Sequence, residues 1–481
     1  MALTKTTTTQ GGLALRTKCN PQRGLDFSRS HLKITNEYYA RYEAVSTVLD
    51  QAPKLVNLIH DDLDKTLEYA NLERCGRRPD YTTDNVLRIL ICQVLEGASL
   101  REIVVRIDDS NFLRRFTRID NGPMMDYTTL CKLKNAIRPE TWKAVNRGLA
   151  EHAVRRELIG GDRLRLDTTA VETNVHYPTD STLLWDVYRT LDRLIRQARE
   201  LDPEAVDSRR LQTRRAKRLQ QKINRRAANK GRSVQQLKPL YMQLMRMVND
   251  LFDWAGSVRK ALAASRRFTS VMDAAKAAAI REEIDHYTVL GRQVVSQARR
   301  RVLQGKRVSN DEKLFSIFEP HTELLKRGKA GKDVEFGHMI QIQQVDGKFI
   351  TDYEVFDGRP VEYELVDSAL KSHKQLFGHY PDELAGDKGY YESMDAIYRL
   401  QHKVPMVSIA KKGRRTPEET ERERDPLFRL AQRFRAGVEG TISFLKRMLR
   451  LARCFNKGWE HFVATIGQTI VAHNLLILAR C

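Results

Sequence analysis

The chain has 481 residues, 41% of them hydrophobic, and its formal net charge at pH 7 is +22. This length suggests about three domains of roughly 150 residues each and leaves enough chain for a buried core. The positive charge predicts a polyanionic partner, because each phosphate neutralised by Lys or Arg releases condensed counterions.

Composition also argues against several classes of protein. The six cysteines form no C-x-x-C pair, which disfavours a zinc site or a disulfide framework and favours a reducing cytoplasm. There is no signal-peptide pattern and no uninterrupted apolar run of about 18 residues, so no membrane span is expected. The nearest candidate, Val463–Leu478, is interrupted by Gln468, His473 and Asn474 and is predicted to be a buried helix.

The amino-terminal part is predicted to be a flexible arm followed by helices. Residues 1–35 lack periodicity and carry several basic side chains, which is typical of a loose arm. From residue 36 to residue 158 the pattern is helical. Ser99 and Glu102 can form a capping box just after Gly97, so a helix, a tight turn and a second helix are expected here.

A further helix in this region carries candidate DNA contacts. Thr128 can cap it, and Lys132 and Lys134 lie beside the apolar Leu130 and Leu133. Short helix pairs of this kind are the material of helix-turn-helix DNA readers. We therefore expect residues 36–158 to bind DNA, with a plain helical bundle as the alternative.

A strand signal and a long helical block follow. Arg163–Asp167 alternates polar and apolar residues, as a half-buried strand requires. Residues 179–311 return to a helical pattern, and within them residues 209–232 contain 11 Lys or Arg and no acid. A solvated helix face is the ordinary explanation of a charge run, but a run of one sign favours phosphate contact. Its candidate DNA contacts are Arg214, Arg215 and Arg225.

The carboxy-terminal part alternates strands and helices. Two strand patterns flank Asp346-Gly347, which predicts a tight hairpin. A helix from Glu362, a short strand at Glu383–Gly386, another helix, a strand at Val404–Ala410, a charged loop and a long helix are expected after it. Together with the strand at Arg163–Asp167, this is the element order of a ribonuclease-H-like fold.

Three acids would meet in such a fold. Its first and fourth strands are neighbours, so Asp167 and Asp387 should lie at one edge of the sheet. Glu439 would come from the long helix packed across that edge, with Val438 and Leu445 on its buried face. Asp162 or Glu172 could replace Asp167, and Asp382 or Glu383 could replace Asp387; Glu439 could also be an exposed acid paired with Arg435.

The sequence resembles the DDE transposases of bacterial insertion sequences that carry a Tyr-Arg-Glu-Lys signature. Asp167-Thr-Thr, the run Asp387-Lys-Gly-Tyr, and the spacing of Arg435, Glu439 and Lys446 match that family. The signature tyrosine is Gln432 here. The region from Tyr81 to about residue 130 is similar to the family's helical amino-terminal region, which recognises transposon ends.

The resemblance implies a specific activity. Asp167, Asp387 and Glu439 would be catalytic residues and ligands of two Mg²⁺ ions, which Mn²⁺ can replace, for cutting element ends and transferring strands to target DNA. Arg435, Lys446, Lys388 and Tyr390 would contact DNA. The expected partners are the terminal inverted repeats and target DNA, bound by a homodimer in the bacterial cytoplasm at the nucleoid. No phosphate-binding glycine loop of the G-x-x-x-x-G-K-[ST] form occurs, so no nucleotide cofactor is expected.

The expected fold class is therefore an α-rich α+β chain. It combines a flexible arm at 1–35, a helical DNA-binding domain at 36–158, and a ribonuclease-H-like α/β catalytic domain at 159–178 and 312–481, interrupted by a basic helical insertion at 179–311. A DNA-binding protein without catalysis, such as a domesticated or decayed transposase, is the alternative. It explains the charge but not three acids at matching positions, since carboxylates beside phosphates repel them unless cations intervene.

Overall fold

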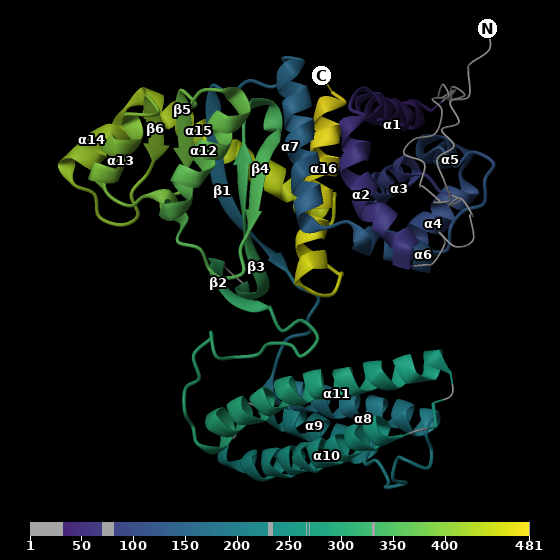
Figure 1. The fold of residues 1–481 in the computed structure, drawn as a ribbon. Coiled ribbons are helices and arrows are strands. Elements are labelled where there is room, and N and C mark those ends of the chain that lie inside the picture. Colours follow the sequence, from purple (N-terminus) through teal and green to yellow (C-terminus); the bar gives the residue numbers. More distant parts are fainter. Residues whose placement is uncertain are drawn as a thin grey trace. The chain divides into compact units, whose positions relative to one another are not determined.

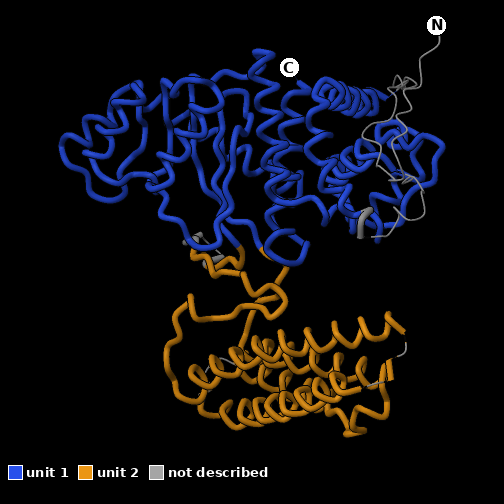
Figure 2. Tube along the Cα trace, viewed as in Figure 1, with its two compact units in different colours: residues 1–172, 338–481 blue, residues 173–337 orange. Residues whose placement is uncertain are grey.

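A computed structural model describes residues 32–69, 81–228, 234–265, 267–268, 270–329 and 332–480. Most of the predicted arm, and the end of the basic run at 229–233, lie outside these residues. The chain forms two compact units, residues 1–172 with 338–481, and residues 173–337 (Figure 2).

The first unit begins with seven helices (Figure 1). They are α1 (Lys33–Gln51), α2 (Lys54–Tyr69), α3 (Thr83–Leu95), α4 (Leu100–Asp109), α5 (Asn111–Thr117), α6 (Tyr127–Ala136) and α7 (Pro139–Arg155). The predicted tight turn is confirmed, because Glu102 N–H donates to Ser99 Oγ at 3.2 Å and Ser99 N–H donates to Glu102 Oε2 at 2.7 Å. The cap of α6 is Asp126 rather than Thr128, whose N–H and hydroxyl both donate to the Asp126 carboxylate.

The last helix, α16 (Trp459–Leu478), is part of the core of this unit. Figure 1 shows α7 and α16 side by side between the sheet and the amino-terminal helices. By length and composition α16 could cross a membrane, but 83% of its apolar window is buried within the protein. Its polar side chains are bonded inside the core: Gln468 donates to Leu90 O at 2.8 Å and Asn474 donates to Ile350 O at 2.7 Å. The predicted buried helix is thus confirmed.

A mixed sheet of six strands forms the rest of the framework. The strands are β1 (Arg163–Glu172), β2 (Glu323–Lys329), β3 (Lys332–Gln344), β4 (Ile350–Val355), β5 (Glu383–Gly386) and β6 (Met406–Ile409). Their order is β2-β3-β1-β5-β6, with β4 also paired to β3. β3 and β4 are antiparallel and joined by the turn η4 (Asp346–Lys348), which confirms the predicted hairpin, whereas β5 is parallel to both β1 and β6.

Helices of the first unit accompany these strands. They are η5 (Glu362–Leu365), α12 (Val366–Phe377), η6 (Lys388–Tyr390), α13 (Met394–Gln401), α14 (Pro417–Arg424) and α15 (Pro426–Arg447). α14 lies within the segment predicted as a charged loop. Thr416 caps it, with Glu419 completing a capping box, so the charge density concealed a helix start signal.

The second unit is a helical bundle with its own hydrophobic core. Its helices are α8 (Asp180–Leu201), α9 (Thr213–Ala228), η2 (Val234–Gln236), α10 (Lys238–Ala264), α11 (Val271–Ala298) and a π-helical turn, η3 (Arg299–Leu303). This unit also holds β2 and the first residues of β3. The sequence pattern gave no signal for β2, because its apolar residues Leu324 and Leu325 are adjacent and do not alternate.

Candidate active site

The register of two parallel strands brings Asp167 and Asp387 together. In the β1–β5 pair Leu166 lies opposite Gly386, so the two acids follow directly after the last paired residues. The prediction that these strands are neighbours is confirmed. Asp167 does not end its strand, however, since β1 continues to Glu172; it lies where the pairing with β5 stops.

The electrostatics of Asp167 indicate that a third acid is close. The pKa of the Asp167 carboxyl is raised to about 6, mainly by burial and then by the negative charges of Asp387 and, to a smaller extent, Glu439. The N–H of Thr168, which donates to Asp167 Oδ1 at 2.7 Å, and the charge of Arg435 act in the opposite direction. A half-buried carboxylate among like charges is typical of a functional site.

Helix α15 carries Glu439 across the sheet. Its buried face includes Val438, Thr441 and Leu445, and the helix packs on β1, β5 and β6. Glu439 lies at the margin of this face with an exposed side chain, and Arg435 Nη2 donates to its Oε1 at 3.4 Å. Arg435 itself is largely buried, and its Nε has no hydrogen-bond partner among the described residues.

A buried arginine fixes α15 to β1. Arg165 donates to Phe434 O on α15 at 2.6 Å and to Gln344 Oε1 at 2.8 Å, and burial lowers the pKa of its guanidinium to about 10. Gln344 in turn donates to Thr441 Oγ1 at 3.0 Å. Gly437 lets the helix backbone approach, since a Cβ there would collide with Arg165 Nη1. The position of Glu439 relative to Asp167 therefore depends on this polar contact.

Gln432, at the position where the resemblance predicts a tyrosine, links α15 to β5 and β6. Its Nε2 donates to Ser408 O at 2.7 Å and to Ser408 Oγ at 3.0 Å on β6, and lies 3.5 Å from Gly386 O, next to Asp387. The residue is a structural link beside the acids.

A Gln432→Leu substitution tests this link. It keeps the volume but removes the only donor group of the side chain, so we expect the free energy of unfolding to fall by about 1 kcal/mol, the value of a typical hydrogen bond. Urea unfolding of the full chain measures the change. Arg433→Leu is the matched control, because Arg433 is exposed on the same helix; an equal loss in both variants would contradict the assignment.

The rival acids lie elsewhere. Asp162 and Asp382 are exposed and directly precede β1 and β5, away from Asp167 and Asp387. There Asp382 N–H donates to Asp162 O at 2.7 Å. Glu172 is paired with Arg453 at 2.7 Å, and Glu383 with Arg163 at 3.0 Å. This placement favours Asp167 and Asp387 over all four rivals.

One acid of this region was missed from the sequence. Glu362, in η5, accepts a hydrogen bond from the Thr168 hydroxyl, and a Cβ on Gly389 would collide with its Oε2. Burial raises the pKa of the Tyr390 phenol, and the charges of Glu362, Asp167 and Asp387 raise it further. Glu362 therefore touches the segments that follow both predicted acids. Only its tertiary position shows this, since nothing in its local pattern distinguishes it.

Two of the predicted DNA contacts are buried and need correction. The Tyr390 side chain is 2% exposed and its hydroxyl accepts from Gln341 at 3.2 Å, so it belongs to the core. Lys134 is 7% exposed, because α6 turns this side inward. Neither side chain lies on the exposed surface, where duplex DNA would contact it.

The remaining predicted DNA contacts stay predictions, and their exposure permits that role. Lys388 is exposed directly after Asp387, and Lys446 is half-buried on α15. Lys132 is exposed on α6. In the second unit Arg214, Arg215 and Arg225 are exposed on α9, whose buried residues are Ala216, Leu219 and Ile223.

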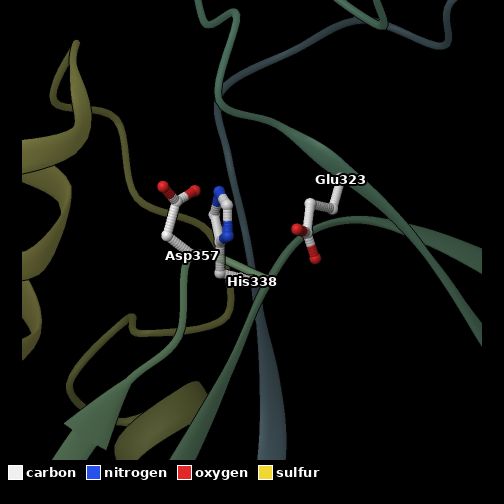
Figure 3. A group of neighbouring side chains, drawn as sticks. All are labelled: Glu323, His338 and Asp357. Carbon is white, nitrogen blue, oxygen red and sulfur yellow. The ribbon is translucent and has the colours of Figure 1, made fainter. Parts of the chain in front are cut away.

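The described residues contain one compact group of metal-type ligands, and it is a different set from the three acids. Figure 3 shows Glu323, His338 and Asp357, whose ligand atoms lie within 4.8 Å of one another. His338 and Asp357 belong to the first unit and Glu323 to the second, and the units are not placed relative to each other, so the group defines no metal site. Asp167, Asp387 and Glu439 do not form so tight a group in this structure.

Comparison with known proteins bears on the amino-terminal helices. Residues 37–136 match the family described as "Transposase domain (DUF772)". No curated protein and no solved structure matches the chain. The matched region supports a transposase role in general for this chain, and with it DNA binding.

Proposed function

We propose that this chain is a DDE-type DNA transposase whose catalytic residues are Asp167, Asp387 and Glu439. The observation that carries the proposal is the register of β1 and β5, which sets Asp167 and Asp387 side by side under the helix of Glu439. The strand order β2-β3-β1-β5-β6, with β4 also paired to β3 and with β1, β5 and β6 parallel, supports a ribonuclease-H-like fold. The transposase-domain match at residues 37–136 supports a transposase role in general.

The donor set fits Mg²⁺. Asp167, Asp387 and Glu439 offer only carboxylate oxygens, the ligands that Mg²⁺ prefers. The raised pKa of Asp167 reflects burial and like-charge repulsion that a divalent cation would relieve. When bound by these three residues, a pair of such ions would supply an activated water and stabilisation of the leaving oxygen of a phosphodiester.

The protein's own residues would orient the DNA. Arg435 brings a largely buried guanidinium to the acids, and we assign it to a phosphate of the element end. Lys388 and Lys446 would contact the same strand. Glu362 is a positioning residue, because it holds Thr168 beside Asp167 and lies against Gly389. Lys132 and the arginines of α9 would bind flanking DNA, and two chains would be needed to bring two ends together.

The test is cleavage of a labelled plasmid that carries the candidate element ends, in Mg²⁺, by the natural chain and by Asp387→Asn. We expect the variant to bind DNA normally and to cut at least about 10³-fold more slowly, because several kcal/mol of transition-state stabilisation are lost. Asp382→Asn, at the other end of β5, should cut normally.

Each other outcome has a clear meaning. Binding without cutting by all three proteins would make the chain a DNA binder without catalysis. Cutting without strand-transfer products would indicate a nuclease. Equal cutting by the natural chain and Asp387→Asn would remove the three acids from the active site.

A further inference from the structure

A second concave site lies in the first unit and shares no residue with the three acids. It is a cavity of about 390 Å³ between the end of α3, the turn before α4, α6, the segment 449–456 and α16. This volume is within the range of small-molecule sites, roughly 300–1,000 Å³. The cavity is formed wholly by described residues of one unit.

The lining of this cavity is positive. Lys134, Arg450 and Arg453 contribute to it, and none of the lining residues is acidic. Arg453 is neutralised from outside the lining by Glu172 at 2.7 Å. Arg450 lies against the turn, since a Cβ on Gly97 would be 3.0 Å from its Nε. An anion entering the cavity would meet Lys134, which has no acidic partner, beside the already paired Arg453.

Lys134 lacks an acidic partner although it is buried. Among the described residues its Nζ makes one hydrogen bond, a long one of 3.4 Å to Gln93 Oε1, which also accepts from Gln468. Burial lowers the pKa of the ammonium to about 8. A buried cation with two unused donors is costly unless a ligand completes its bonding.

The other lining groups suit a nucleoside. Phe455 is 68% exposed at the cavity and offers a ring on which a base can stack. The lining amides of Gln93, Gln468 and Asn456 already donate to Ala98 O, Leu90 O and Thr465 Oγ1, so the base would be held by stacking and not through its edge. We propose that this cavity binds a phosphorylated nucleoside, with its phosphate on Lys134 and its base against Phe455. The nucleotide is either free or part of a DNA strand.

This inference does not depend on the proposed catalysis. Because the chain lacks a phosphate-binding glycine loop, the phosphate would be held by side chains alone. Nucleotide binding can therefore be measured without divalent metal, under which condition the three acids would not catalyse cleavage. A failure of nucleotide binding then leaves the proposed catalysis untouched, and a failure of cleavage leaves nucleotide binding untouched.

The experiment compares Lys134→Met with Lys371→Met in the full chain. Lys371 is exposed on α12 and lies outside the cavity. Calorimetric titration with AMP tests a free nucleotide, and fluorescence anisotropy with short single-stranded DNA tests a nucleotide within a strand. We expect Lys134→Met to weaken binding of one of these ligands at least about tenfold, the effect of losing one charge-assisted hydrogen bond, and Lys371→Met to change it much less.

A second variant distinguishes a loss of ligand binding from a folding defect. Phe455→Ala changes an exposed ring, so it should fold normally and weaken the same ligand as Lys134→Met. Loss of AMP binding in both variants supports a free nucleotide, and loss of single-stranded DNA binding alone supports a nucleotide within DNA. If neither ligand distinguishes Lys134→Met from Lys371→Met, the proposal is wrong.

Discussion

An Asp167→Asn variant is expected to be more stable than the natural chain at neutral pH and yet to have lost DNA cleavage. The carboxyl of Asp167 has a pKa of about 6 in the folded chain, raised by burial and then by the charges of Asp387 and Glu439, against about 3.9 when unfolded. Between these two values the folded chain holds a proton that the unfolded chain has released. Stability therefore falls as pH rises from about 4 to about 6, and the loss is complete above that window.

Asparagine has no carboxyl group to titrate, so the Asp167→Asn variant does not lose this stability as pH rises. A difference of about two pKa units corresponds to at most about 3 kcal/mol, so the variant should gain up to this amount at about pH 7 and little or nothing near pH 4. Urea unfolding of both proteins across this pH range measures the gain. Cleavage should fall at least about 10³-fold in the same variant.

Asp162→Asn is the control, because Asp162 is exposed at the other end of β1. It should change neither stability nor cleavage. An Asp167→Asn variant with the same pH profile of stability as the natural chain would show that Asp167 is not a strained carboxylate.

An Arg165→Met variant is expected to lose about 3 kcal/mol of unfolding free energy, since two acceptors lose their hydrogen bonds to a buried cation. These acceptors are Phe434 O and Gln344 Oε1, both bonded to the guanidinium. The contact also sets α15 on β1, so cleavage should fall together with stability, because Glu439 is carried by that helix. Urea unfolding and plasmid cleavage provide the two measurements.

Arg163→Met is the matched control. Arg163 is on the same strand, and both guanidinium groups stack on the ring of Phe434, at 4.0 Å from its centroid for Arg163 and 4.6 Å for Arg165. Arg163 is partly exposed, however, and is paired with Glu383. Exposed ion pairs contribute at most about 1 kcal/mol, so the loss should be smaller. Equal losses in the two variants would mean that the buried contact does not hold α15 in place.

The framework of the first unit could be predicted because its signals are local. The capping box at Ser99, the Asp346-Gly347 turn and the apolar face of α15 are each contained in a few residues. The adjacency of Asp167 and Asp387 followed from strand order, and the register confirms it.

The features that were missed depend on tertiary contacts. Glu362 reaches Thr168 from an element almost 200 residues away, and no periodicity reports such a contact. Lys134 sits on a helix whose apolar pattern does not specify how far the buried face extends, and the cavity beside it is formed by the distant segment 449–456. β2 exists because β3 provides a partner strand, which its own sequence does not indicate.

The placement of the second unit within the chain has a consequence for folding order. β1 and β3 are neighbours in the sheet, but in the sequence the second unit, residues 173–337, begins directly after β1 and ends within β3. Pairing two strands across so long a loop is slow, because closure entropy must be lost before any contact compensates for it. Once the bundle of α8 to α11 has formed from contacts within itself, that loop is no longer a random chain. Closing the loop then costs less entropy, and the pairing of β1 with β3 follows the folding of the bundle.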